Sequence, residues 1–375
     1  MPVSIIHTAD WQIGKQFTNV PGDAGAVLRE QRFHTVRRIA DVARERSVDA
    51  VLVAGDLFDS NAVKDETVRR TINAMEGFAG PWVLLPGNHD AALAESVWTR
   101  MNRWGTAENL VLATSREPIP LANGGMIVLP APMRCKQEAV DLTEWFDVAE
   151  TPAAAVRMGL AHGSVADRLP EQAEAKNPIA EDRADRARLD YLALGDWHGT
   201  RQIGPRTWYA GTPEPDRCKE NDPGNVLIVN IQEPGAQPSV ERITVGHFHW
   251  RLLEASIDSR ADIEMLDACL RDFGIPVERL VVELRLKGAI GLATRLALDN
   301  MLEQWRAHVR YLEVSDVNLI AQPSEEDLDC IGCGGFIRAA VDRLRARADD
   351  PGDAASDAAG LALRILYVEH VRTGA

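Results

Sequence analysis

Residues 3–14 read Val-Ser-Ile-Ile-His-Thr-Ala-Asp-Trp-Gln-Ile-Gly, an apolar run that ends in an aspartate and then a glycine. A second apolar run at 50–54 is followed by Gly55-Asp56, and a third at 82–85 is followed by Gly87-Asn88-His89-Asp90. Short runs rich in Val, Ile and Leu are typical of strands that are buried on both faces. Polar residues that follow such strands gather at one edge of an α/β sheet, so this order predicts both a fold and a site.

The rest of the first 230 residues continues the alternation of apolar runs and helical stretches. Further short apolar runs lie at 126–129, 158–161, 191–194 and 226–231. Apolar residues recur at helical spacing over Ala26–Arg46, Lys64–Phe78 and Ala92–Trp104. Strands that alternate with helices predict an α/β domain with a substantial sheet.

The pattern changes after about residue 240. The turn-rich segment Glu233–Pro238 is typical of a linker. Beyond it, strand-like runs alternate with two helical stretches, and the end of the chain is helical. We therefore predict a first domain over 1–238, a smaller α+β domain over 239–320 and a helical C-terminal tail over 321–375.

The composition excludes several classes of protein. The chain has 375 residues, of which 45% are hydrophobic and 26% charged, as in ordinary globular domains, so intrinsic disorder is excluded. The net charge of −15 excludes a surface that binds nucleic acid everywhere, so any DNA contact must be a local patch. Four arginines surround the block at 195–199: Arg183, Arg186, Arg188 and Arg201. They could contact phosphates, or they could form a solvated helix face. The acidic residues that interleave with them favour the solvated face.

The sequence also bears on the cellular compartment and on the role of the cysteines. No apolar stretch approaches the ~18 residues of a membrane span, and the first residues lack the basic region of a signal peptide, so we expect a cytoplasmic protein without membrane contact. The five cysteines are scattered, which argues against a disulfide framework. A lone Cys330-Ile331-Gly332-Cys333 has no second pair and is interpreted as incidental.

The polar residues after the strands suit divalent cations. Asp10 and Asp56 supply hard carboxylate oxygens, Asn88 an amide oxygen, and His162 and His198 imidazole nitrogens. This mixture of oxygen and nitrogen ligands suits Mn²⁺, Fe²⁺, Zn²⁺ or Mg²⁺. A carboxylate that bridges two such ions would hold them ~3.5–4 Å apart, the spacing used in phosphoester hydrolysis.

Five blocks in this order resemble the pattern of the calcineurin-like metallophosphoesterases: D-x-[H]-x-G, G-D, G-N-H-[DE], H and G-[H]-x-H. Within that superfamily the chain is similar to the SbcD and YhaO group of DNA repair nucleases, in His7-Thr8-Ala9-Asp10 and in Tyr209-Ala210-Gly211-Thr212-Pro213. The resemblance implies a β-sandwich flanked by helices (αββα), followed by an α+β capping domain over 239–320 and the helical tail.

The resemblance also implies roles for single residues. Asp10, Asp56 and His198 would hold a first metal ion, and Asp56, as the bridge, would hold a second with Asn88 and His162. His89 would be the general acid that protonates the leaving alkoxide, or would steer the phosphate, and an imidazole suits this task because its pKa lies near neutrality. Asp90 would orient His89, and water activated by the two ions would attack the phosphorus.

The chain departs from the pattern at two positions. Gln12 and Asp196 stand where histidines are usual. Both can bind a metal ion, and with Asp196 the set contains three carboxylates, which favours harder ions such as Mn²⁺ or Mg²⁺. Either the site is retuned and active, which we favour, or the first metal ion binds weakly and the site is slow or inactive.

The resulting prediction is a metal-dependent phosphodiesterase that acts on DNA, an exonuclease of the SbcD type with two divalent cations, Mn²⁺ first and Mg²⁺ or Fe²⁺ as alternatives. One alternative is a phosphoesterase for small molecules or cyclic nucleotides. Another is a catalytically weak subunit that binds DNA or a partner. The predicted partners are DNA, an ATPase of the SbcC type and a second copy of the chain in a homodimer.

Overall fold

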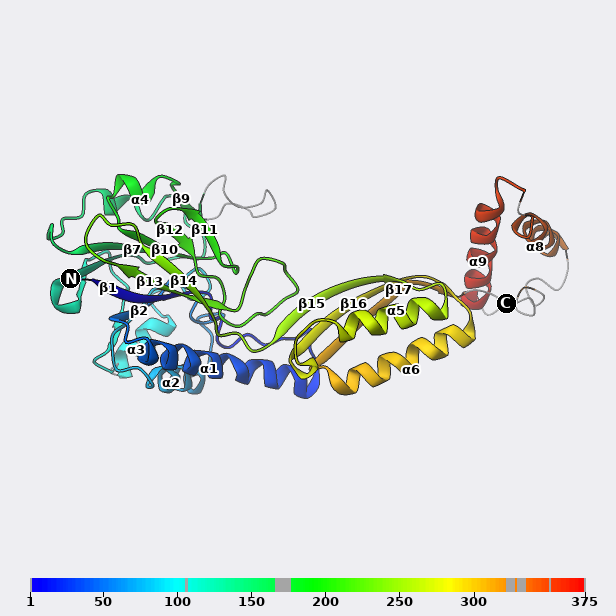
Figure 1. The fold of residues 1–375 in the computed structure, drawn as a ribbon, viewed down its shortest axis with the longest axis horizontal. Coiled ribbons are helices and arrows are strands. Elements are labelled where there is room, and N and C mark those ends of the chain that lie inside the picture. Colours follow the sequence, from blue (N-terminus) through cyan, green and yellow to red (C-terminus); the bar gives the residue numbers. More distant parts are fainter. Residues whose placement is uncertain are drawn as a thin grey trace. The chain divides into compact units, whose positions relative to one another are not determined.

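The computed structural model describes residues 2–104, 107–165, 177–321, 328, 335–350 and 352–373. The chain divides into two compact units, Met1–Phe248 and His249–Ala375, which are described separately (Figure 1). The Cys330–Cys333 motif of the sequence analysis lies outside the described residues.

The first unit contains two sheets of six strands each, in the orders β14-β13-β1-β2-β3-β4 and β11-β12-β10-β7-β6-β5. The first sheet consists of β1 (Val3–Thr8), β2 (Ala50–Val53), β3 (Trp82–Leu84), β4 (Leu110–Leu112), β13 (Asn225–Ile231) and β14 (Ser239–Thr244). The second consists of β5 (Ile119–Leu121), β6 (Met126–Ala131), β7 (Val156–His162), β10 (Tyr191–Gly195), β11 (Arg201–Gly204) and β12 (Thr207–Tyr209). β1 to β4 run parallel to one another, as do β6, β7, β10 and β12, whereas β5, β11, β13 and β14 pair antiparallel.

Helices cover the outer faces of this sandwich, and Figure 1 shows α1, α2 and α3 together on the side of the first sheet. The helical elements of the unit are α1 (Gly22–Glu45), α2 (Asp65–Met75), α3 (Val97–Trp104), α4 (Arg183–Arg186), η1 (Ala122–Gly124) and η2 (Glu144–Asp147), and a short pair of strands, β8 (Ser164–Val165) and β9 (Pro178–Ile179), completes it.

Three buried clusters correspond to these layers. Side chains such as Leu52 and Leu160 fill the space between the two sheets. Ile39 of α1 belongs to the cluster that joins the helices to the first sheet. Phe146 of η2 and Leu189 belong to the cluster on the outer face of the second sheet. The predicted α/β fold with a helix-flanked sandwich is confirmed.

The boundary between the units differs from the predicted one by ten residues. The sequence analysis ends the first domain at residue 238, whereas the first compact unit extends to Phe248. The reason is β14, which pairs antiparallel with β13 from Asn225↔Thr244 to Asn230↔Ser239 and so belongs to the first sheet. The division into three domains stays a prediction.

The second unit begins with a parallel sheet of three strands, β15 (His249–Ser256), β16 (Leu280–Ile290) and β17 (Tyr311–Ala321). The connecting elements are α5 (Arg260–Arg271), η3 (Val277–Arg279) and α6 (Leu292–His308). α5 begins at a capping box, in which the side chains of Ser259 and Asp262 each accept from the other's backbone N–H. Leu266, Leu284 and Leu298 belong to the core that joins both helices to the sheet.

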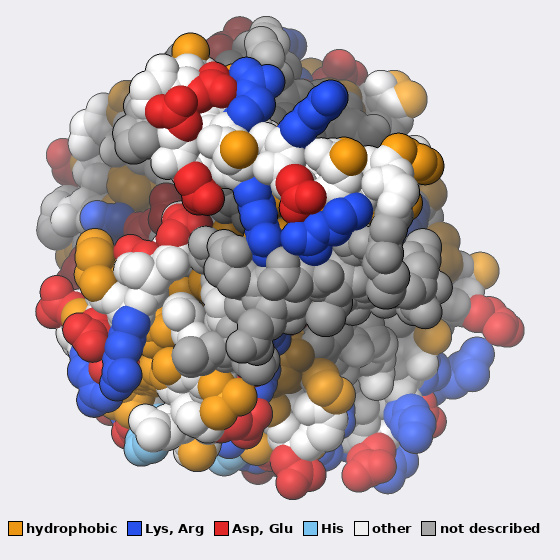
Figure 2. Space-filling view, turned by 90° about the vertical axis from the view of Figure 1, so that its right-hand side faces the viewer, with side chains coloured by type: hydrophobic (Ala, Val, Ile, Leu, Met, Phe, Trp, Pro, Cys, Tyr) orange, Lys and Arg blue, Asp and Glu red, His pale blue; other side chains and the backbone are white. Residues whose placement is uncertain are grey.

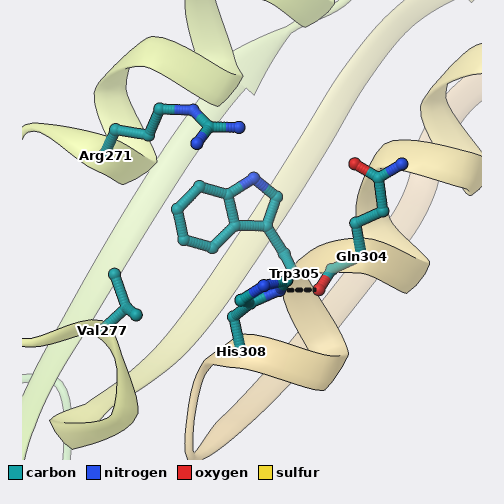
Figure 3. Close-up of a pocket in the computed structure, with 5 residues that line it drawn as sticks. All are labelled: Arg271, Val277, Gln304, Trp305 and His308. Carbon is teal, nitrogen blue, oxygen red and sulfur yellow. Dashed lines mark hydrogen bonds between the residues drawn. The ribbon is translucent and has the colours of Figure 1, made fainter.

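A cavity of about 170 Å³ lies between α5, η3 and α6 (Figure 3). Its lining residues are Arg271, Val277, Gln304, Trp305 and His308. The Trp305 indole donates to Asp267 Oδ1 at 2.8 Å, and the guanidinium of Arg271 lies 5.6 Å from the indole ring while it also pairs with Asp267. These contacts tie α5 to α6, so we interpret the cavity as part of the packing of this unit.

The helical tail consists of α8 (Gly335–Ala348) and α9 (Ser356–Thr373). Val341 and Leu363 share a small buried cluster with Leu328, whereas Phe336 is 84% exposed. Figure 2, which faces this end of the chain, shows basic and acidic side chains mixed with single apolar ones. In the described part of the chain, no helix combines the length and the apolar character that crossing a membrane requires.

Candidate metal centre

The loops that follow β1 and β2 run side by side and carry the first predicted ligands. Asp10 donates its backbone N–H to Gly55 O at 3.1 Å, and Gln12 donates to Asp56 O at 2.9 Å. Ile13 continues this pairing with a bond to Leu57 O at 3.0 Å. The position of Asp10 relative to Asp56 is therefore set by the backbone.

Several predicted ligand positions adopt left-handed backbone geometry, which is uncommon outside glycine. The φ values are 54° at Asp10, 47° at Gln12, 53° at Asp56 and 103° at Asp196. Such conformations cost about 1–3 kcal/mol each and persist where the surrounding structure enforces them, which is typical of functional sites. Here the bonds between the two loops supply that enforcement.

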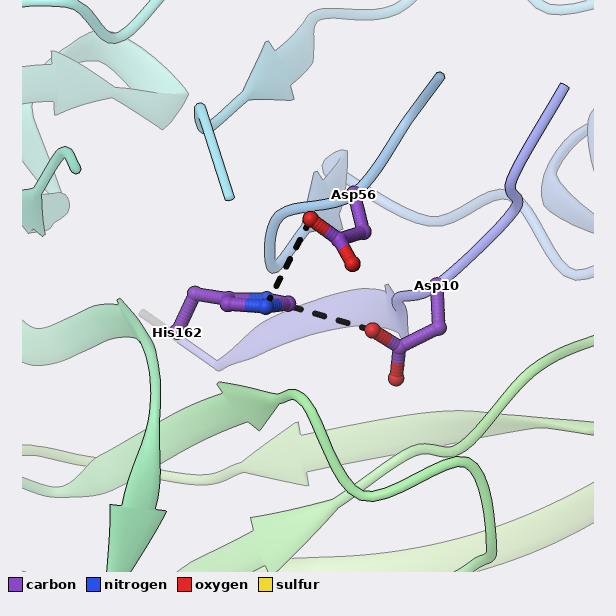
Figure 4. Close-up of side chains that lie close together, drawn as sticks. All are labelled: Asp10, Asp56 and His162. Atoms are coloured by element: carbon purple, nitrogen blue, oxygen red, sulfur yellow. Dashed lines mark ion pairs between the residues drawn. The ribbon is translucent and has the colours of Figure 1, made fainter. Parts of the chain in front are cut away.

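Asp10, Asp56 and His162 form the innermost part of the site (Figure 4). One ligand atom from each lies within 4.8 Å of the others, and all three residues are buried. His162 Nε2 lies 3.6 Å from Asp56 Oδ1, and His162 Nδ1 lies 3.9 Å from Asp10 Oδ1. Since Asp10 and Asp56 follow strands of the first sheet and His162 ends β7 of the second, the cluster lies where the two sheets meet.

Glycines allow the two sheets to approach at His162. A Cβ atom on Gly195 would lie 1.9 Å from Ala54 O and 2.8 Å from His162 Nδ1, so no other residue fits there. His162 Nδ1 lies 2.9 Å from the same Ala54 carbonyl oxygen, which can only accept a hydrogen bond. The proton of the neutral ring is therefore on Nδ1, and Nε2 keeps a lone pair that points to the carboxylates.

Burial and charge shift the pKa values of this cluster strongly. Burial raises the pKa of Asp10 to about 6, although His198 and His162 act in the opposite direction. Burial alone would lower the pKa of His162, but the carboxylates of Asp56, Asp10 and Asp196 raise it to about 9. The surroundings therefore favour positive charge at the centre of a group of buried carboxylates.

Asn88 and Asp196 lie at the edge of this cluster. The amide of Asn88 lies 2.9 Å from His162 Nε2, and with its nitrogen turned inward it donates to both oxygens of Asp56 at 3.1 Å. Asp196 Oδ1 lies 3.8 Å from His162 Nε2, while Ser164 Oγ donates to Asp196 Oδ2 at 2.8 Å. The backbone N–H of Asp196 donates to Asp10 Oδ1 at 3.1 Å, which links the last block of the pattern to the first.

His89 and Asp90, the predicted catalytic pair, point in different directions. The His89 side chain is 38% exposed, with Nε2 3.9 Å from Asp56 Oδ2 and Nδ1 3.0 Å from Asp59 O. Asp90 is fully buried and accepts from the backbone N–H groups of Gly87 at 2.7 Å and Phe58 at 2.9 Å. Asp90 thus braces two of the ligand loops, and its catalytic role stays a prediction.

Gln12 and His198 are held by their neighbours. Gln12 Nε2 donates to Asp56 Oδ2 at 3.1 Å, so the nitrogen of this amide faces the cluster. His198 Nδ1 lies 3.1 Å from Arg217 Nη2 and 3.8 Å from Asp216 Oδ1. His198 is near enough to Asp10 to lower its pKa, although it is not one of the three innermost residues.

The arginines around the block at 195–199 differ in their contacts. Arg183 is buried and pairs with Asp141 and Asp147, so this member of the group serves the packing of the unit. Arg186 is exposed and pairs with Asp147, and Arg201 lies 5.8 Å from the ring of Trp197.

The donor set fits divalent cations. Two carboxylates and one imidazole form the innermost group, and Asn88, Asp196 and Gln12 lie against it. The innermost group is buried, and negative charges that are shielded from water are costly. The raised pKa values of Asp10 and His162 reflect that cost, and a cation would lower it. A cation that bound Gln12 through its oxygen would require this amide to turn over, because its nitrogen faces Asp56.

Comparison with known proteins agrees with this geometry. The profile of the calcineurin-like phosphoesterase family matches residues 3–199, which span all seven predicted ligands. The chain belongs to this family. Its predicted class, a metal-dependent phosphoesterase, is confirmed, and the use of divalent metal ions follows from the family and the donor cluster.

Relatives of this phosphoesterase are similar at low identity. The DNA double-strand break repair protein Mre11 of Methanosarcina acetivorans is 24% identical over 283 residues, 68% of this chain and only 41% of that protein. The uncharacterized metallophosphoesterase YhaO of Bacillus subtilis is 23% identical, over 81% of this chain and 73% of that protein. The SbcD component of the SbcCD nuclease of Escherichia coli K12 is 22% identical, over 84% of this chain and 91% of that protein. The predicted resemblance to the SbcD and YhaO group is confirmed.

The residues that hold His198 were not predicted from the sequence. Asp216 is 6% exposed and contacts Lys15, Arg32 and Arg217 as well as His198. Burial alone would raise the pKa of Asp216, but His198, Arg32 and Arg217 hold it well below its usual range. The one signal in the sequence was the segment Pro213-Glu214-Pro215-Asp216-Arg217, which lies shortly after β12 and so follows the block of His198.

Proposed function

We propose that this phosphoesterase hydrolyses phosphodiester bonds of DNA with two divalent cations. The observation that carries the proposal is the buried group of Asp10, Asp56 and His162, in which two carboxylates lie within 4.8 Å of an imidazole nitrogen. The choice of DNA is supported by relatives named as a DNA repair protein and as part of a nuclease.

The proposed ligands follow the positions of the side chains. Asp10, Gln12, Asp56 and His198 would hold one cation, with Asp196 beside it. Asp56, Asn88 and His162 would hold the other, with Asp56 between the two. When bound, the cations would supply an activated water molecule and stabilise charge on the phosphate.

His89 would deliver the proton to the leaving alkoxide. Nδ1 faces the carbonyl oxygen of Asp59 at 3.0 Å, so it carries a proton in the neutral ring, and Nε2 lies on the side of Asp56. A protonated His89 would therefore present Nε2–H to a substrate held by the cations. The partial exposure of His89 fits a group that must reach a substrate oxygen.

The identity of the cation is proposed from the ligand types. Asp196 adds a third carboxylate to Asp10 and Asp56, which favours harder cations. We therefore propose Mn²⁺, with Mg²⁺ and Fe²⁺ as the next candidates.

One contact favours a second candidate function, a catalytically weak subunit that binds DNA or a partner. Gln12 donates to Asp56 at 3.1 Å, and this bond must break before the Gln12 oxygen can bind a cation. Weak binding of the first cation would leave the fold intact with slow turnover.

The C-terminal helices supply a candidate surface for a partner. Phe336 on α8 and Leu361 and Ile365 on α9 are 84%, 47% and 53% exposed. A similar protein is named as one subunit of a nuclease, which supports the proposal that these helices bind an ATPase of the SbcC type. Assembly into a homodimer stays a prediction.

Hydrolysis assays test the proposed function. The native chain with Mn²⁺ is incubated with linear DNA, with a 2′,3′-cyclic nucleotide and with bis(p-nitrophenyl) phosphate, in parallel with Asp56→Asn. We expect cleavage of DNA that falls by at least about 1,000-fold in Asp56→Asn. Cleavage of the cyclic nucleotide alone would identify a cyclic nucleotide, and not DNA, as the substrate. Absence of turnover with retained DNA binding would favour the catalytically weak subunit.

A further inference from the structure

Basic side chains gather beside His198 in a chain whose net charge is −15. Arg217 Nη2 lies 3.1 Å from His198 Nδ1. Next to it, Lys219 Nζ lies 4.4 Å from the ring centroid of Trp197. Lys15 reaches the same place from the loop after β1, since Lys15 and Arg217 both pair with Asp216. A polyanion that approaches the metal centre from this side meets positive charge, whereas Asp10, Asp56 and Asp196 would repel it.

Asp216 holds Lys15 and Arg217 in place. Its side chain is 1% exposed and lies 3.0 Å from Arg217 Nε, and it also contacts Lys15 Nζ. Arg32 approaches Asp216 at 3.5 Å from α1, and Arg32 Nη1 donates to Trp11 O between the predicted ligands of the first loop. The carboxylate of Asp216 is thus anchored in the core and orients the Lys15 and Arg217 side chains at the surface.

Lys15 and Arg217 both keep N–H donors that could bind a ligand. The side chains of Lys15 and Arg217 are 24% and 50% exposed, although the carboxylate that pairs with them is buried. An ammonium group has three N–H donors and a guanidinium five, more than Asp216 and His198 can accept. Phosphate oxygens are the ligands that such a pair prefers.

The position of Arg217 determines which phosphate group of a substrate it can bind. It contacts His198, a predicted ligand at the edge of the site, and not the innermost group of Asp10, Asp56 and His162. A phosphodiester bound to the cations would therefore have Arg217 and Lys15 at its side and not at its reacting oxygens. A substrate with a single phosphate group gains little from them, whereas a nucleic-acid strand carries a further phosphate on each side of the scissile one.

We propose that Lys15 and Arg217 form a subsite for the phosphate next to the scissile phosphodiester of a nucleic-acid strand, with Asp216 as the residue that positions both. The proposal rests on the proposed function and adds a basis for selection: the subsite favours strands over isolated phosphodiesters. Lys219 and Arg201, which lie near Trp197, extend the basic surface beyond this subsite.

Binding of a strand tests the subsite without any need for turnover. A fluorescein-labelled single-stranded oligonucleotide is titrated with the full chain in EDTA, so that it is not cut, and anisotropy is followed at several salt concentrations. We expect Arg217→Gln to weaken binding about tenfold, which corresponds to about 1.4 kcal/mol. The slope of log affinity against log salt should fall by about one.

Two matched variants complete this experiment. Arg217→Lys keeps the charge and should retain most of the affinity. Arg38→Gln removes an exposed arginine of α1 that pairs with Glu45, so it changes the net charge equally and should leave the affinity within about twofold of the native value. Equal losses in Arg217→Gln and Arg38→Gln would overturn the subsite.

Kinetics separate failure of the subsite from failure of the proposed function. With Mn²⁺, the loss of kcat/KM in the double variant of Lys15→Gln and Arg217→Gln should be about tenfold larger for the oligonucleotide than for bis(p-nitrophenyl) phosphate. Equal losses on both substrates would also overturn the subsite but leave the phosphodiesterase activity intact. A native chain that cleaves neither substrate contradicts the proposed function, and the anisotropy result then decides the subsite alone.

Discussion

Two buried histidines in the first unit occupy regions of opposite character. His162 lies among carboxylates, and its pKa is raised to about 9 in spite of burial. His7 on β1 is also fully buried, but its ring contacts Tyr191 Oη at 2.9 Å and Leu194 O at 3.2 Å, and burial lowers its pKa to about 3. The comparison teaches that burial alone does not decide the charge of an imidazole. The neighbouring groups decide it, and of these two regions that of His162 favours positive charge.

The largest effect is expected at the centre of the charged region. His162→Asn should lower kcat by about 1,000-fold and weaken Mn²⁺ binding, because it removes the imidazole between Asp10 and Asp56. Calorimetric titration with Mn²⁺ and a phosphodiesterase assay measure both effects. His34→Asn, at an exposed histidine of α1, is the control and should change neither.

The next effect is expected at the exposed edge of the same region. His89→Ala should lower kcat by about 100-fold or more, the usual contribution of a general acid. Because its Nε2 lies 3.9 Å from Asp56 and is not needed as a ligand, Mn²⁺ affinity should change by less than about threefold. A loss of metal binding as large as that in His162→Asn would show that His89 belongs to the ligand set.

The region of His7 should affect the pH dependence of stability. Between pH 6.5, the ordinary pKa of histidine, and about 3, the unfolded chain binds a proton that folded His7 does not, so acidification destabilises the fold. From pH 6.5 to 5 this amounts to about 2 kcal/mol.

In His7→Gln the loss of unfolding free energy over this interval should be about 2 kcal/mol smaller than in the native chain. Urea titrations at both pH values measure it. The exposed histidine variant His34→Gln is the control and should keep the native pH dependence. A His7→Gln variant with the same pH dependence as the native chain would contradict a neutral, buried His7.

The smallest effect is expected at Asp196, which stands where the family pattern has a histidine and lies at the outer edge of the charged region. Asp196→His removes one of the carboxylates near His162 and should shift the preference from Mn²⁺ towards Zn²⁺ by about tenfold. Activity with each metal ion at limiting concentration measures the shift. Asp222→His, on an exposed aspartate that pairs with Arg242, controls for the change of charge.

Much of this fold could be predicted from local patterns. The strands β1, β2 and β3 are short buried runs, and a predicted ligand follows each, so the positions of Asp10 and Asp56 could be predicted from the sequence. The two-sheet sandwich followed only from the resemblance to a known family, because local patterns do not show that β7 and β2 belong to different sheets that pack face to face. The local patterns alone predict a site at one sheet edge, whereas Asp10 and Asp56 of the first sheet meet His162 of the second.

Other differences have local causes. The helix predicted from Ala92 begins only at Val97, because the Ser96 and Thr99 side chains and backbones bond to one another at its start. Trp11, which follows the first ligand, is 1% exposed and packs edge-on against Trp82. Asp216 escaped notice because its role depends on Lys15 and Arg32, which only the folded chain brings near it.

The left-handed backbone at Asp10, Gln12 and Asp56 bears on how this enzyme can be altered cleanly. Asparagine and glycine tolerate such φ values, whereas alanine and branched residues do not. An exchange of Asp10 or Asp56 for asparagine removes one negative charge and leaves the turn undisturbed. An exchange for alanine would add a conformational penalty to the lost ligand, and its poor yield could be mistaken for a catalytic defect.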